Sequence, residues 1–212
     1  MVESSVVKHF WSFLNRYFKE TEIIHHHPFT IIVNNDKRTV KPDFYINGNQ
    51  RLLFEFKELK ESDDPNSHLG RRLDFINKST EEPTSQFVRS ISPYIKNKIF
   101  EAADQLKPAE ELKCPAVLVV HSGVPGICCE FNDGTFMEAM YHPARKDESA
   151  RTPAEIFPYI SAVANFRCDT NNVYHIKFYH NYYATCKLPS DALDGSECEH
   201  YDDFEGWIED SD

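Results

Sequence analysis

The feature that most constrains the fold is an apolar run, CPAVLVVHSG, at residues 114–123. The run has the length of a strand, and its apolar residues do not alternate with polar ones. A strand of that kind is covered on both faces, so it lies inside a sheet that carries helices on each side. The run therefore predicts an α/β fold with a central β-sheet flanked by helices.

Two stretches predict the long helices. Residues 3–18 carry apolar side chains at helical spacing. A second apolar stripe predicts a helix over residues 86–106, with Pro93 as a kink or restart and Pro108 as its end. Between them, the polar segment 61–82 predicts a loop with a short helix that overhangs neighbouring strands.

Three strands are expected directly after the first helix. The runs PFTIIVNN and RTVKPDFYI predict a hairpin, and RLLFEFKEL follows the turn signal Asn47-Gly48. These runs predict a three-stranded meander and, with the central strand, a mixed sheet. The histidines at 25–27 are expected in a polar loop before Pro28.

The last third of the chain predicts additional strands. A hairpin is expected about residues 132–134, a charged loop over 145–151, and two aromatic strands on either side of 169–172. From Asp191 to Asp212 there are ten acids and no Lys or Arg, which predicts a weakly ordered acidic tail. We therefore expect a single domain over residues 1–190, with its core at 1–121 and extra strands at 122–190.

Two acids and a lysine lie on the second and third expected strands. Asp43 follows Pro42 in KPDFYI, and Glu55 and Lys57 are two residues apart in FEFKE. Residues i and i+2 of a strand point to the same face, so the Lys57 ammonium lies beside the Glu55 carboxylate. Carboxylates bind hard cations such as Mg²⁺, which assist attack on a negatively charged phosphodiester. These residue types predict a metal-dependent phosphodiesterase site, in which nearby carboxylates keep Lys57 protonated.

The register of the two strands decides whether the two acids meet. Opposed residues in an antiparallel pair share a face, so Asp43 joins Glu55 only where the numbers of paired residues add to an even sum. A two-residue Asn47-Gly48 turn gives an odd sum, whereas a three-residue loop gives an even one. We therefore predict an odd-length loop, or a bulge near Pro42.

The order helix, strand, strand with Pro42-Asp43, strand with Glu55-X-Lys57, helix, strand resembles the restriction-endonuclease-like core of the PD-(D/E)XK nuclease superfamily. The resemblance covers residues 1–121. It implies metal-dependent cleavage of nucleic acid, with DNA preferred over RNA. It also implies Mg²⁺, or Mn²⁺ in its place, bound by Asp43 and Glu55, and a water placed or activated by Lys57. Members often add a glutamate from the first helix, which makes Glu3 a candidate outer ligand.

A cluster of basic residues between His68 and Phe100 is the candidate surface for nucleic-acid phosphates, because phosphate affinity comes largely from Lys and Arg. Outside the acidic tail the chain has 24 acids and 23 Lys or Arg, so its body is close to neutral. The candidate nucleic-acid-binding residues are Arg71, Arg72, Arg89, Lys96 and Lys98. Gln105 is a further candidate for phosphate contact.

Other interpretations stay open at the level of sequence. A catalytically inactive subunit with the nuclease fold would bind nucleic acid or a protein partner in a larger complex. The acidic tail would cover the basic surface or engage a basic partner protein, with Tyr201, Phe204 and Trp207 as apolar anchors. A homodimer is also compatible with the sequence. No membrane span and no targeting segment is visible, so a cytoplasmic location is expected.

Overall fold

Residues 116–122 of the apolar run form the central strand of the sheet. In the computed structural model, which describes residues 5–33, 35–59, 91–122, 132–143 and 151–202, strand β6 (Ala116–Ser122) is the fourth of seven. Its first five residues are buried, and parallel strands β5 (Arg51–Leu59) and β7 (Ala162–Cys168) flank it. The prediction of a central, doubly covered strand is confirmed.

Antiparallel pairs extend the sheet on both sides, so the sheet is mixed. On one side, β4 (Phe44–Asn47) pairs with β5 and β1 (Ile23–His25) pairs with β4. On the other side, β8 (Tyr174–His180) pairs antiparallel with β7, so the two expected aromatic strands do extend the sheet. The edge strand β9 (Cys198–Tyr201) lies parallel to β8.

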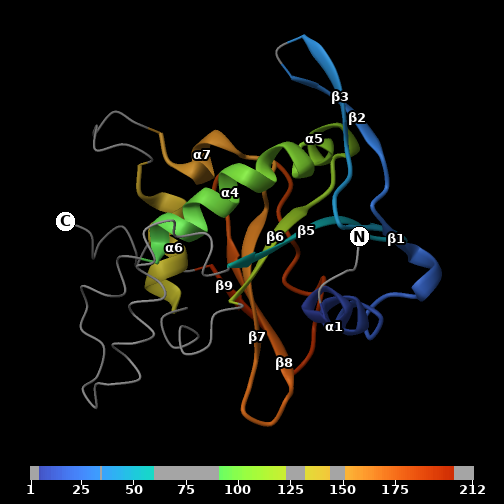
Figure 1. Cartoon of the computed structure of the whole chain (residues 1–212), viewed down its shortest axis with the longest axis vertical. Helices are drawn as coiled ribbons and strands as arrows, with labels where there is room; N and C mark the ends of the chain where they lie inside the picture. The colour runs from blue at the N-terminus through green and yellow to red at the C-terminus, as the bar shows by residue number, and fades with distance from the viewer. Residues whose placement is uncertain (1–4, 34, 60–90, 123–131, 144–150, 203–212) are drawn as a thin grey trace.

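Helices cover both faces of this sheet (Figure 1). One face carries α4 (Ser92–Leu106), α5 (Pro108–Leu112), α6 (Asp133–Tyr141) and α7 (Pro153–Ile156), whose apolar residues form a common core cluster with the inner residues of β6. The other face carries α1 (Ser5–Leu14), which is followed by the short 3₁₀ helix Glu20–Glu22. Among the described residues, no helix combines the length and apolarity required to cross a membrane.

The helix boundaries differ from the expected ones at proline. Helix α4 begins at Ser92 with Pro93 in its first turn, where the missing N–H of proline does not interrupt a helical hydrogen bond. For the same reason Pro108 begins α5 and does not simply end α4. Residues 86–90 and the expected loop 61–82 lie outside the described residues.

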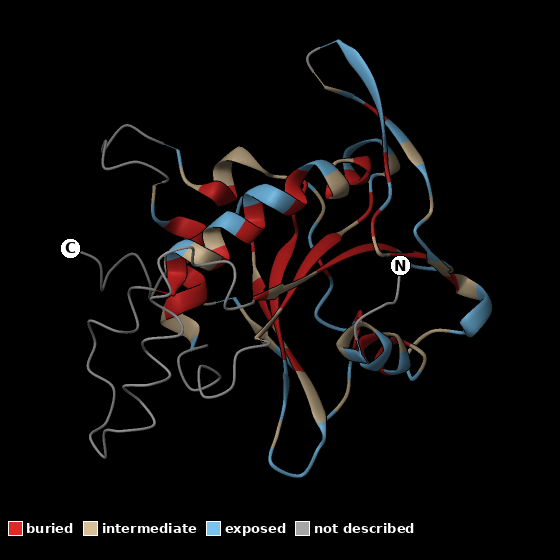
Figure 2. Ribbon diagram, viewed as in Figure 1, coloured by how far each residue is buried: buried red, intermediate tan, exposed pale blue. Residues whose placement is uncertain are grey.

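The first two expected strands do form an antiparallel pair, but the expected three-stranded meander is wrong. Strands β2 (Phe29–Val33) and β3 (Asp36–Val40) form a separate two-stranded sheet, which we call the β2–β3 ribbon. The run RTVKPDFYI is divided between β3 and β4, because Pro42 has no N–H to donate to a ladder. Figure 2 shows the ribbon extending from the layered body, with most of its residues exposed.

Two expectations about the last third are also wrong. Residues 132–134 do not form a hairpin, because the Asn132 side chain accepts a hydrogen bond from the Thr135 N–H and caps the start of α6. The acidic segment is part of the domain as far as residue 202, since Leu193 is fully buried and β9 belongs to the sheet. Tyr201 packs against the core as an anchor, whereas residues 203–212 and the charged loop 145–150 lie outside the described residues.

Candidate functional site

The loop between β4 and β5 sets the register on which the site depends. Asn47 pairs with Arg51, so three residues, 48–50, form the loop, and the predicted odd length is confirmed. An added Cβ at Gly48 would lie 2.9 Å from the Glu22 carboxylate carbon, so a larger residue there would require the Glu22 side chain to shift. Phe44 pairs with Phe54, and continuing this register by one residue brings Asp43 opposite Glu55.

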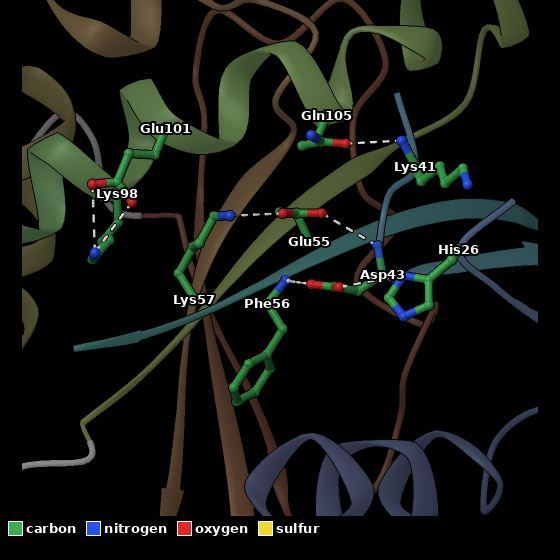
Figure 3. A network of polar contacts seen from close by, with 9 residues as sticks. All are labelled: His26, Lys41, Asp43, Glu55, Phe56, Lys57, Lys98, Glu101 and Gln105. Atoms are coloured by element: carbon green, nitrogen blue, oxygen red, sulfur yellow. Dashed lines mark hydrogen bonds and ion pairs between the residues drawn. The ribbon is translucent and has the colours of Figure 1, made fainter. Parts of the chain in front are cut away.

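Two hydrogen bonds join Asp43, which directly precedes β4, to strand β5 (Figure 3). The Asp43 N–H donates to Oε2 of Glu55 at 3.2 Å, and the Phe56 N–H donates to Oδ2 of Asp43 at 2.8 Å. The two acids are therefore neighbours, and the charge of Asp43 acts on the Glu55 carboxyl.

Lys57 completes the cluster from the same face of β5. Its Nζ lies 2.8 Å from Oε1 of Glu55, as expected for residues two apart on a strand. Phe56 points to the other face, where it packs against the ring of Phe10 in α1. The alternation that the sequence predicts for β5 thus separates the polar site from the aromatic core beneath it.

The Glu55 carboxylate is buried beside a second negative charge. Its side chain is only 6% exposed, and burial together with the charge of Asp43 raises its pKa to about 7, although Lys57 opposes this shift. A second positive charge beside the two acids would relieve this repulsion. The electrostatics of the pair therefore fit a bound cation.

The donor set also fits Mg²⁺. Carboxylates are the ligands a hard cation prefers, and protein Mg²⁺ sites commonly supply one or two of them and complete the octahedron with water and substrate phosphate. In the part of the chain that the structure describes, no group of three or more His, Cys, Asp or Glu is arranged around a common metal position. Of the three candidate ligands, the structure describes Asp43 and Glu55, and Glu3 lies outside the described residues.

Two residues that the sequence did not assign to the metal site hold the backbone around Asp43. The Lys41 N–H donates to Oε1 of Gln105 in α4 at 2.9 Å, which ties the segment before Asp43 to the helix. The His26 N–H donates to the Asp43 carbonyl at 3.2 Å, and Nδ1 of His26 lies 3.7 Å from Oδ1 of Asp43. No local signal marks His26, because its position depends on the pairing of β1 with β4.

The candidate phosphate surface is described only in part. The candidate Lys98 is only 8% exposed, and its Nζ lies 3.1 Å from the Glu101 carboxylate. The Lys96 ammonium donates to the carbonyls of His142 and Pro143, and burial lowers its pKa. Arg71, Arg72 and Arg89 lie outside the described residues, so a role in phosphate binding stays a prediction for all five.

A cleft of about 480 Å³ opens at the other end of the β4–β5 hairpin. Tyr17, Glu22, Gly48 and Asp191 are among its lining residues, and it includes none of Asp43, Glu55 and Lys57. The candidate site thus lies apart from this cleft.

The fold and the site together define an α/β domain in which one acid directly before β4 meets an acid and a lysine of β5 in a mixed sheet. Comparison with protein-family models, with curated proteins and with solved structures found no match.

Proposed function

We propose that this chain is a Mg²⁺-dependent nuclease that hydrolyses phosphodiester bonds of nucleic acid, with DNA as the preferred substrate. The observation that carries the proposal is the convergence of Asp43, Glu55 and Lys57 where β4 meets β5. The order α1, β4–β5 hairpin, α4 and parallel β6 supports the further proposal that the core is restriction-endonuclease-like.

In this proposal the two acids hold the cation. Asp43 and Glu55 would bind Mg²⁺, or Mn²⁺ in its place, and Glu3 would be an outer ligand. When bound, the ion supplies Lewis-acid stabilisation of charge on the phosphate and lowers the pKa of a water molecule. The backbone hydrogen bonds to both carboxylates position them before the ion arrives, which reduces the reorganisation that binding requires.

Lys57 acts on the reacting groups beside the acids. Its side chain is 25% exposed and its ammonium lies within hydrogen-bonding distance of Glu55, so in this proposal it orients a water molecule at the edge of solvent. Removing this charge would leave the negative charge that develops on the phosphate without a fixed partner.

A catalytically inactive nuclease-fold subunit is the second candidate function. The observation that favours it is that Asp43, Glu55 and Lys57 already bond to one another and to the backbone, as in a purely structural ion cluster. Only cleavage separates the two candidates, because both have the same fold and the same contacts.

The test is an incubation of the full chain with circular duplex DNA, linear duplex DNA, single-stranded DNA and RNA. Each substrate is treated with Mg²⁺, with Mn²⁺ or with EDTA, and a Lys57→Ala variant purified in the same way is the control. We expect products that require a divalent ion and that the variant does not form. The enzyme proposal fails if no substrate is cleaved, if EDTA leaves cleavage intact, or if the variant cleaves like the parent.

A further inference from the structure

The β2–β3 ribbon leaves the body of the molecule beside the candidate site. Its first strand begins three residues after His26, whose N–H is bonded to the Asp43 carbonyl. Its second strand ends at Val40, and the next residue, Lys41, is held by Gln105. Both ends of the ribbon are therefore anchored next to the proposed metal ligand Asp43.

The root of the ribbon is packed, so its direction is fixed by the fold. Ile31 is 2% exposed and Val40 is 6% exposed. The Phe29 ring lies 5.4 Å from the Tyr45 ring of β4. Each strand has five residues, and at about 3.4 Å per residue the ribbon is about 17 Å long.

The outward face of the ribbon is polar and basic, with one apolar residue left in solvent. Its register pairs Thr30 with Thr39 and Ile32 with Lys37, and all four residues are exposed. The Ile32 side chain is 57% exposed and gives this face one apolar contact surface.

Positive charge is concentrated on the same arm. Lys37, Arg38 and Lys41 are exposed, and Asp36 is the single acid between residues 29 and 41, in a chain whose formal net charge is −11. Arg38 faces Asp104 of α4 at 3.8 Å, but both side chains are 54% exposed, so this pair is a weak one. The arm therefore matches a polyanion in charge.

We propose that the β2–β3 ribbon is an arm that binds duplex nucleic acid in its major groove, next to the Asp43–Glu55 site. A major groove about 12 Å wide admits a two-stranded ribbon. In this position Lys37, Arg38 and Lys41 contact phosphates, and Thr30, Ile32 and Thr39 face the base edges. A length of about 17 Å covers roughly five base pairs beside the cleaved bond. The location of that bond rests on the proposed function, whereas the binding of duplex does not.

The test measures binding without cleavage. Full-length Lys37→Glu/Arg38→Glu is compared with the parent chain and with Lys8→Glu/Lys19→Glu, which makes the same charge change at exposed residues near α1. Affinities for a duplex of about 20 base pairs and for one of its strands are measured by fluorescence anisotropy, in EDTA, over a series of salt concentrations. We expect the ribbon variant to weaken duplex binding at least about tenfold at low salt, and to reduce the slope of log affinity against log salt by about 2.

Other outcomes overturn the proposal that the ribbon is a duplex-binding arm. It fails if the parent does not bind duplex, if the control variant weakens binding as much as the ribbon variant, or if single-strand binding falls by the same factor as duplex binding. If the parent cleaves DNA and the ribbon variant binds duplex as tightly as the parent, the nuclease proposal is retained and the arm proposal is rejected. Duplex binding through the ribbon without any cleavage would retain the arm and reject the nuclease.

Discussion

Two lysine–carboxylate clusters lie on the same face of the sheet, and they differ in which partner is buried. The site cluster is Lys57 with Glu55 and Asp43, and the edge cluster is Lys177 with Asp133 and Glu199. Lys57 and Lys177 belong to one row across the sheet, which runs through Val120 of β6 and Asn165 of β7 and continues to Glu199. The two lysines are almost equally exposed, at 25% and 22%.

The two clusters differ in how far their acids are exposed to solvent. In the edge cluster, Lys177 lies 2.8 Å from Asp133 and 3.6 Å from Glu199, and these acids are 43% and 54% exposed. The Tyr201 ring lies 5.4 Å from the ammonium and gives it a further favourable contact. In the site cluster, Glu55 is 6% exposed and has a second acid beside it. Each cluster has one lysine and two acids, so the clusters differ in solvation and not in formal charge: water screens the acids around Lys177, whereas Glu55 is buried beside a second acid.

Alanine substitutions in the two clusters should have very different effects on turnover. We expect Lys57→Ala and Asp43→Ala each to reduce turnover by about a hundredfold or more, because groups that act on transition-state charge contribute roughly this much. Lys177→Ala should leave turnover within about threefold and lower the free energy of unfolding by about 1 kcal/mol. Initial rates on duplex DNA and urea unfolding measure the two quantities. Equal effects of Lys57→Ala and Lys177→Ala on turnover would remove the distinction between the clusters.

Neutralising one acid of each cluster should show that only the site cluster makes stability fall as pH rises. A raised carboxyl pKa means that the folded chain binds the proton more tightly than the unfolded chain. In the metal-free protein, stability should therefore fall as pH rises from about 4.5 to about 7. Glu55→Gln removes this loss, and we expect it to raise the free energy of unfolding by about 1 to 2 kcal/mol at about pH 8 and by little at about pH 5.

The matched control is Asp133→Asn, which removes a partner of Lys177 and of the Tyr179 hydroxyl. It should destabilise the fold at both pH values. Added Mg²⁺ should raise the melting temperature of the parent at about pH 8, but not that of Glu55→Gln. If Glu55→Gln lowers stability at about pH 8, the buried Glu55 carboxylate is stabilised by its partners, and the contrast with the edge cluster fails.

Residues 191–202 of the acidic segment belong to the fold, so shielding of the basic surface is tested on the acids after residue 202. Glu199 belongs to the edge cluster and β9 to the sheet, so removing residues 191–212 would damage the fold. Truncation after Asp202 removes five acids and leaves β9 in place. If those acids shield the basic surface, the truncated chain should bind DNA about twofold to tenfold more tightly at low salt, with the difference decreasing as salt screens the charges. Unchanged affinity at every salt concentration would exclude shielding and leave a protein partner or a solubilising segment.

The smallest effect is expected at the end of β8, on the same strand as Lys177. His180 lies 2.9 Å from His200, and burial with the neighbouring His200 and Lys187 lowers the pKa of His180 to about 4, although Asp202 opposes the shift. The fold therefore favours neutral His180, and its contribution to stability is lost as pH falls from about 6.5 to about 4. His180→Gln should reduce the drop in melting temperature between about pH 7 and pH 5 by a few degrees. An identical drop in parent and variant would assign the acid sensitivity to other groups.

The local pattern of the chain was sufficient for the elements that form the site. The apolar run of β6, the helical stripes of α1 and α4, and the β7–β8 hairpin follow from side-chain periodicity. The parity of strand pairing even predicted the odd-length loop after Asn47, because a shift of one residue would move Asp43 to the other face.

Long-range contacts decided what the pattern could not. The sequence does not show that β3 leaves the sheet at Pro42, that His26 and Gln105 hold the backbone around Asp43, or that β9 joins the edge of the sheet. Each of these features depends on contacts between residues far apart in the chain, and such contacts form only when the apolar surfaces of the two segments pack together.

The sequence by itself thus determined the residue types of the site, their alternation on β5 and the central position of β6. Only the tertiary structure decided that Glu55 is buried beside Asp43 while the acids around Lys177 remain solvated. The physical reason is that a side chain's solvation depends on the layers packed around it, and a strand pattern shows which face a residue occupies without showing what covers that face.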